Sequence, residues 1–181
     1  MIEILRLRFA PLRMTRKVTK LVASAGVLFA VSVSAVAAGP GIDVSHIIDQ
    51  AMAESVLDVK VKEAEPRNVQ GGDGHYSKCN YYSVPPGKTL LLRLYQAADG
   101  YDPEKEFEAL TKNTPATIEV LGLGDKAIIT TGIASGLPQR VLMLYAIKKN
   151  ALITVGLSGL QDEGAALEKA KSVAQKILAQ L

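Results

Sequence analysis

Hydrophobic residues recur at every second position in several stretches of the chain, a pattern typical of β-strands with one buried face. The stretch 88–97 shows it most clearly, because three leucines alternate with three other side chains. One side of this stretch carries Leu90, Leu92 and Leu94, and the other side carries Leu91, Arg93 and Tyr95. Similar patterns predict further strands over residues 56–65, 78–84, 126–131, 140–148 and 151–158.

Hydrophobic residues spaced three or four apart predict three helices, each with an aspartate that can cap its first turn. They follow Asp43 (residues 43–54, with Ser45 as a second possible cap), Asp102 (residues 103–113, with Pro103 at the first helical position) and Asp162. The last helix carries a stripe of small and aliphatic residues, namely Ala166, Ala170, Val173, Ile177 and Leu181. Such a stripe is the face that a surface helix buries against a core.

Short turns join consecutive predicted strands, which indicates antiparallel pairing. Pro85-Pro86-Gly87 and Lys149-Asn150 have the composition of such turns, and the three glycines of residues 68–74 predict a loop. The predicted order is α-β-β-β-α-β-β-β-α. We therefore expect an α+β fold, with an antiparallel sheet of about five to six strands packed with two to three helices.

The first 37 residues have the three-part pattern of a secretory signal peptide. Six basic residues and one acidic residue come first, a charge-free run follows as far as Ile42, and Ala-Val-Ala-Ala closes its apolar part. We expect cleavage after Ala37, which leaves a single α+β domain over residues 38–181 that is periplasmic or secreted. Two alternatives stay open: Met14 is the true start, or the leader is kept as a membrane anchor.

The meaning of the net charge changes once this leader is set apart. The chain has 21 basic and 18 acidic residues, for a net charge of +3. Because the leader holds six of the basic residues and one of the acidic residues, the remaining domain carries a charge of −2. A near-neutral domain lacks the electrostatic footprint of a nucleic-acid-binding protein. We therefore expect no nucleic-acid partner, and no membrane span after cleavage.

Rare residue types exclude several chemistries. One cysteine and two histidines rule out an intrachain disulfide framework, a multi-cysteine zinc site and a cysteine-ligated iron–sulfur cluster. We expect no metal and no cofactor. Residues 122–127 match the loose pattern G-x-G-x-x-A, but a dinucleotide site needs a helix at that point, and the sequence that follows is typical of a strand. The motif therefore predicts a glycine turn.

Cys79 lies in the segment of the sequence that is richest in reactive groups, His75-Tyr76-Ser77-Lys78-Cys79-Asn80-Tyr81-Tyr82. Three interpretations of its thiol stay open: a buried structural residue, a partner in an intermolecular disulfide, or a functional thiol that acts with His75. The first is favoured because free cysteines are commonly buried. Alternation in a strand predicts Cys79 and Tyr81 on one face of the sheet, and Asn80 and Tyr82 on the other.

Four of the six tyrosines lie in or beside the first predicted hairpin, together with an arginine. Tyrosine and arginine are enriched at binding surfaces. The candidate binding residues are therefore Tyr81, Tyr82, Arg93, Tyr95 and His75. The alternative is a sheet face that is simply covered by aromatic side chains, which are ordinary strand residues.

Several segments carry a resemblance to a known group: the strand Cys79-Asn80-Tyr81, the Gly-Leu-Gly-Asp-x-Ala turn at 122–127, the hairpin with Lys148-Lys149-Asn150 and the alanine-rich last helix. Together they resemble small exported bacterial domains with the PsbP-like α-β-α sandwich, a group that includes mycobacterial lipoproteins and the extracellular sensor domain of a receptor kinase. The resemblance implies a fold and an envelope location. Many such domains have a cysteine partner or a lipid-attachment cysteine, and this chain has neither.

No complete catalytic constellation is visible in the sequence. We therefore expect a non-enzymatic binding or accessory domain, exported to the periplasm or envelope, that contacts a protein or a small ligand through the first hairpin. The alternative hypothesis is an enzyme of unrecognised type that uses Cys79 and His75, because a cysteine nucleophile needs a base beside it.

Overall fold

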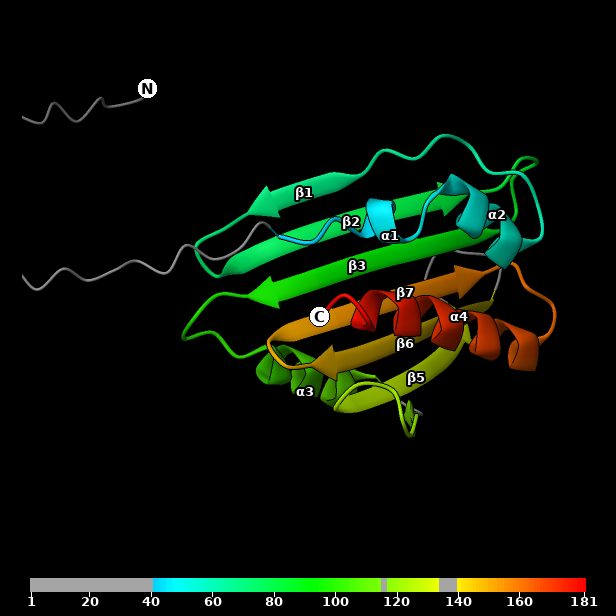
Figure 1. Cartoon of the computed structure of the whole chain (residues 1–181). Coiled ribbons are helices and arrows are strands. Elements are labelled where there is room, and N and C mark those ends of the chain that lie inside the picture. Colours follow the sequence, from blue (N-terminus) through cyan, green and yellow to red (C-terminus); the bar gives the residue numbers. More distant parts are fainter. Residues whose placement is uncertain (1–40, 115–116, 134–139) are drawn as a thin grey trace, which may run out of the picture. The chain divides into compact units, whose positions relative to one another are not determined.

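One antiparallel sheet forms the framework of the residues that the computed structural model describes, which are 41–114, 117–133 and 140–181. These described residues contain seven strands in the order β1-β2-β3-β7-β6-β5-β4 (Figure 1). The strands are β1 (Arg67–Gln70), β2 (Gly74–Tyr82), β3 (Thr89–Ala97), β4 (Thr117–Glu119), β5 (Lys126–Ile133), β6 (Arg140–Lys148) and β7 (Ala151–Ser158). Every neighbouring pair is antiparallel, so the predicted α+β class and antiparallel pairing are confirmed.

The predicted numbers of strands and helices were too low, because the described residues contain seven strands and four helices. β1 lies where a glycine loop was predicted, and all four of its residues are exposed. An exposed edge strand has no buried face, so it leaves no alternation in the sequence. β4 has three residues and gives too short a pattern for the same method to detect.

The segment after the first helical region is the clearest error in the predicted order. Residues 56–65 were expected to form a strand, but Val56 and Leu57 close helix α2 (Gln50–Leu57). Asp58 then takes a left-handed conformation with φ of 51°, and beyond it Val61 forms an isolated antiparallel bridge with Ser83, the residue after β2. Leu57 is fully buried, so its hydrophobicity reflects helix packing. A short apolar run is ambiguous between the two structures.

The helix predicted over residues 43–54 is two helices, because it contains two capping aspartates. Asp43 caps α1 (Val44–Ile47) by accepting a hydrogen bond from the Ser45 backbone N–H. Asp49 caps α2 in the same way through the Met52 N–H, at 2.8 Å. A side chain that caps a new helix needs an extended backbone at its own position, so Asp49 interrupts the helix in which it was placed.

The other two helices agree with the prediction. Asp102 caps α3 (Pro103–Asn113), and Asp162 caps α4 (Glu163–Leu178). The predicted stripe of α4 is buried as far as Ile177, and Leu181 beyond the helix is half-buried. The glycine motif at 122–127 is a turn, since Gly122 and Gly124 have φ of 75° and 66° and β5 follows.

The two faces of the sheet are covered to very different extents. Helices α1, α2 and α4 lie against one face, and α3 lies on the opposite side (Figure 1). The large core lies between the sheet and helices α1, α2 and α4. It includes Leu90, Leu92, Leu144, Ile153 and Val155, all fully buried. We call this the covered face.

Helix α3 covers only part of the other face, which we call the open face. Phe107 of α3 forms a small second cluster with Ile128, Ile147 and Leu152. Leu110 of α3 packs against the same cluster, together with tyrosines of β3 and β6. No helix among the described residues covers the remainder of the open face, and it is the place where a site can form.

Candidate functional site

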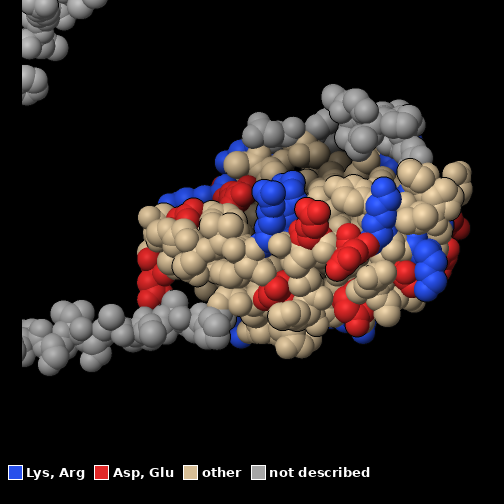
Figure 2. Space-filling view, turned by 90° about the horizontal axis from the view of Figure 1, so that it is seen from above, with Lys and Arg blue, Asp and Glu red and all other residues tan. Residues whose placement is uncertain are grey.

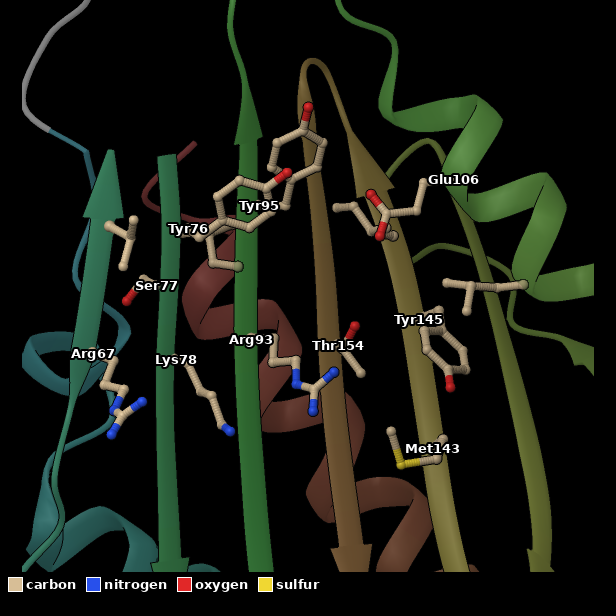
Figure 3. Close-up of a pocket in the computed structure, with 14 residues that line it drawn as sticks. Arg67, Tyr76, Ser77, Lys78, Arg93, Tyr95, Glu106, Met143, Tyr145 and Thr154 are labelled. Atoms are coloured by element: carbon tan, nitrogen blue, oxygen red, sulfur yellow. The ribbon is translucent and has the colours of Figure 1, made fainter. Parts of the chain in front are cut away.

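A pocket of about 400 Å³ lies on the open face, beside helix α3. Its floor comes from β1, β2, β3, β7 and β6, and α3 forms one wall (Figure 3). Apolar side chains line much of it, among them Val69, Leu110, Met143 and Leu152. A concave, largely apolar pocket with a few polar groups is the usual form of a small-molecule site.

Two stacked tyrosines stand over the floor of the pocket. The rings of Tyr76 and Tyr95 face each other, with centroids 4.6 Å apart and planes 16° from parallel. Tyr76 donates a hydrogen bond to the Asp73 carboxylate at 2.5 Å, and Tyr95 donates one to the Asp73 backbone carbonyl at 3.0 Å. Because Asp73 holds both hydroxyl groups, the rings form a fixed aromatic wall.

Titration of the two tyrosines reflects the same contacts. The hydrogen bond to the Asp73 carboxylate raises the pKa of Tyr76 well above its usual range, since ionisation would remove the donated proton beside a negative charge. Burial raises the pKa of Tyr95, and the charge of Asp73 adds to the effect. Both phenols therefore stay neutral at physiological pH, and the wall offers flat, uncharged surface.

Three basic side chains cross the pocket floor in a single row. Arg67 of β1 is the register partner of Lys78 of β2, and Lys78 is the partner of Arg93 of β3. Residues directly opposite each other in a sheet point to the same face, so the three charges lie side by side on the open face (Figure 3). All three are exposed, and no salt bridge among the described residues involves any of them. We call this set the basic row.

The row continues as polar residues on the next two strands. Arg93 pairs with Thr154 of β7, and Thr154 pairs with Tyr145 of β6. Burial raises the pKa of Tyr145, and the positive charge of Arg93 opposes that rise. The positive charge of the Arg93 guanidinium is therefore close enough to influence Tyr145 electrostatically inside the pocket. Glu106 of α3 also lines the pocket, on the side away from Arg67 and Lys78 (Figure 3).

Charges of both signs mix over the rest of the surface that Figure 2 shows. The side seen there has blue and red side chains close together, and no single sign covers it. On this side the described residues form no extended basic surface. A local cluster suits one small anionic group better than a long polyanion, which needs a basic stripe.

The structure divides the predicted binding residues between the two faces. Arg93 and Tyr95 line the pocket. Tyr82 is also on the open face and 50% exposed, but it lines an adjoining hollow that shares Arg67 and Lys78 with the pocket. Tyr81 is on the covered face and only 2% exposed.

Cys79 and Tyr81 lie under helix α1, in the large core. Cys79 is fully buried, and burial raises the pKa of its thiol. Burial likewise raises the pKa of Tyr81, whose hydroxyl donates a hydrogen bond to the backbone carbonyl of Ile48. A neutral, buried thiol is a poor nucleophile, because the thiolate is the reactive form.

His75, the fifth predicted binding residue, is the second residue of β2 and is half-buried. Its ring lies against Gly41, where a β-carbon would come within 2.0 Å of it, and its Nε2 is buried without a hydrogen-bond partner. His75 and Cys79 are four residues apart on one strand, which separates them by about 13 Å. The structure therefore does not bring the predicted thiol and imidazole together.

Several pocket residues were missed by sequence reasoning. Arg67 lies on the strand that was read as a loop, and Tyr145, Met143 and Thr154 come from strands whose order in the sheet was unknown. Lys78 was noticed but was given no role. The signal that could have found it is charge at alternate positions of adjacent strands, and this requires the register of the pairing.

Comparison with known proteins does not assign the chain to a family, because no protein-family model and no curated protein matches it. The resemblance to the PsbP-like group stays a prediction. Residues 41–114, 117–133 and 140–181 include no group of acidic, histidine and cysteine side chains able to hold a metal ion. The same part of the chain has no helix long and apolar enough to cross a membrane.

Proposed function

We propose that this protein is an exported binding domain that holds a small organic ligand in the pocket on the open face, without transforming it. The observation that supports the proposal is the unequal covering of the sheet. Of the four helices in the described part of the chain, three pack over the covered face, whereas α3 packs on the open face and leaves a pocket of about 400 Å³ beside it. That volume lies within the range of small-molecule sites.

The composition of the pocket favours binding of a partly apolar molecule. Leucine, methionine and tyrosine side chains would remove apolar ligand surface from water. A few polar groups, such as Thr154 and Arg93, would fix the orientation of the ligand. The hairpin of β2 and β3 that the sequence singled out contributes part of this surface, and β1, β6, β7 and α3 contribute the rest.

The alternative function, an enzyme that uses Cys79 and His75, has no supporting observation in the described residues. Its thiol is buried in the core under α1, and its imidazole lies farther along the same strand. Neither residue lines the pocket. We therefore propose only the binding function.

Fluorescence of N-phenyl-1-naphthylamine, a neutral probe that brightens in apolar surroundings, tests the proposed pocket. We expect saturable binding to the wild-type protein. Thr154→Phe fills the floor and Leu110→Trp fills the helix side, so each should weaken binding at least tenfold. The matched control is Leu121→Phe, which adds an aromatic ring at a residue that is 85% exposed and outside the pocket. Absent binding to the wild type, or binding to both filled variants as tight as to the wild type, would overturn the proposal.

Export is the part of the proposal that rests on the leader pattern of residues 1–37. The test is N-terminal sequencing of the protein recovered from outside the cytoplasm. We expect the chain to begin at Ala38 or Gly39. Recovery from a membrane fraction with Met1 or Met14 at the N-terminus would contradict cleavage.

A further inference from the structure

We infer that the ligand is an organic anion, whose acidic group lies on the basic row of Arg67, Lys78 and Arg93 and whose apolar body lies against the tyrosine wall. This inference rests on the proposed binding function and adds the chemical class of the ligand. Its basis is the combination of three cations that form no salt bridge with any described residue and an apolar pocket with a flat aromatic wall next to them.

The basic row costs stability in the free protein. Like charges directly opposite each other on neighbouring strands repel, whereas opposite charges there attract. Here two consecutive pairs are both cation against cation. Elsewhere in the described chain lysines do find carboxylates, for example Lys126 with Glu104 and Lys60 with Glu54. The row therefore lacks a partner that other basic residues of this domain have.

The spacing of the row suits one acidic group. Opposed residues on neighbouring strands have β-carbons about 5 Å apart, and arginine and lysine side chains are long enough to converge from that distance on a single carboxylate, sulfonate or phosphate. Arg93 already acts on Tyr145 inside the pocket, and Arg67 and Lys78 form the boundary with the adjoining hollow. The acidic group would therefore sit between Arg93 and this boundary.

The acidic residues near the pocket determine which way the ligand points. Glu106 projects from α3 on the side of the pocket away from Arg67, so it repels an anion there (Figure 3). Glu63 and Glu65 line the hollow beyond Arg67 and Lys78, so they repel an anion from the outer side of the row. The remaining position is over the row itself. The apolar body of the ligand then extends along Tyr95 and Leu152 toward α3.

Two probes with one skeleton separate this inference from the proposed function. 1-Anilinonaphthalene-8-sulfonate is N-phenyl-1-naphthylamine with an added sulfonate, so their difference in affinity reports the anion. We expect the sulfonate probe to bind about tenfold more tightly at 20 mM salt, the equivalent of one good charge-assisted contact. The advantage should shrink at 500 mM salt, because exposed charges are screened.

Substitutions within the row locate the anion. Arg93→Gln and Lys78→Gln should each reduce the affinity for the sulfonate probe several-fold more than they change the affinity for the neutral probe. Lys176→Gln is the matched control, since it removes an exposed charge from α4 on the covered side. Both row variants should unfold at the same temperature as the wild type or at a higher one, because repulsion is relieved.

The possible outcomes distinguish the proposed binding function from the inference that the ligand is an anion. If the neutral probe binds in the pocket and the sulfonate brings no advantage, the anion inference is overturned and the binding function stands. If the advantage persists when Arg67, Lys78 and Arg93 are all replaced by glutamine, the anion binds elsewhere and the inference is also overturned. If the neutral probe does not bind, the proposed function fails, and the inference that rests on it fails with it.

Discussion

The two faces of the sheet differ in how completely their apolar side chains are buried and their polar side chains are paired. On the covered face, leucines of β3 are fully buried and Tyr81 donates its hydroxyl proton to the Ile48 carbonyl. On the open face, Arg67, Lys78 and Arg93 lie opposite one another beside half-buried apolar side chains. The covered face therefore supplies most of the stability, whereas the open face keeps an arrangement that costs stability and suits a ligand.

Truncation of one apolar residue on each face should give the largest contrast. Leu92 is fully buried on the covered face, and Leu92→Ala should lower the free energy of unfolding by about 2–5 kcal/mol, because it leaves a cavity in close-packed surroundings. Met143 is half-buried on the open face, and Met143→Ala should cost less than about 1.5 kcal/mol. Urea unfolding measures both. Equal losses would mean that the open face is a closed core in solution.

Adjacent tyrosines provide a smaller and sharper contrast. Tyr81→Phe removes the hydroxyl that satisfies the buried Ile48 carbonyl, and it should cost about 1–3 kcal/mol. Tyr82→Phe, one residue farther on and 50% exposed, removes a hydroxyl that accepts only from Asn80 and should change stability by less than about 0.5 kcal/mol. Thermal or urea unfolding of the two variants compares them. A larger loss for Tyr82→Phe would reverse the assignment of the faces.

The covered face could be predicted from the sequence because burial on one side leaves a periodic pattern. Alternation in residues 88–97 correctly put Leu90, Leu92 and Leu94 on one side, and the capping aspartates of α3 and α4 were placed correctly. The errors arose where this signal is weak or ambiguous. β1 is exposed on both sides, and Leu57 is the buried last residue of a helix whose end was predicted to belong to a strand.

The candidate site was only partly predictable, because it depends on register. Alternation put Arg93 and Tyr95 on one face, and both line the pocket. The proximity of Arg67 to Lys78 is a pairing between two strands, and nothing along a single sequence reports it. Cys79 and His75 lie close together in the sequence, but residues four apart on an extended strand are too distant to react together.

The smallest predicted effect is an increase in the free energy of unfolding, and it tests the basic row itself. Lys78→Gln removes the charge that lies between Arg67 and Arg93, so it should raise the free energy of unfolding by about 0.2–0.5 kcal/mol at low salt. Lys78→Glu should raise it further, because two repulsive pairs become attractive. Both gains should fall in 1 M salt, where the screening length is about 3 Å.

Stability and binding should therefore move in opposite directions at this position. Lys78→Glu is expected to stabilise the domain while it weakens the affinity for the sulfonate probe more than Lys78→Gln does. Substitution of a residue that only supports the fold would lower both the stability and the affinity. Substitution of a surface lysine with no role in either would change neither. If Lys78→Glu destabilises the domain at low salt, the three charges do not repel one another across the strands, and the main argument for an anionic ligand is removed.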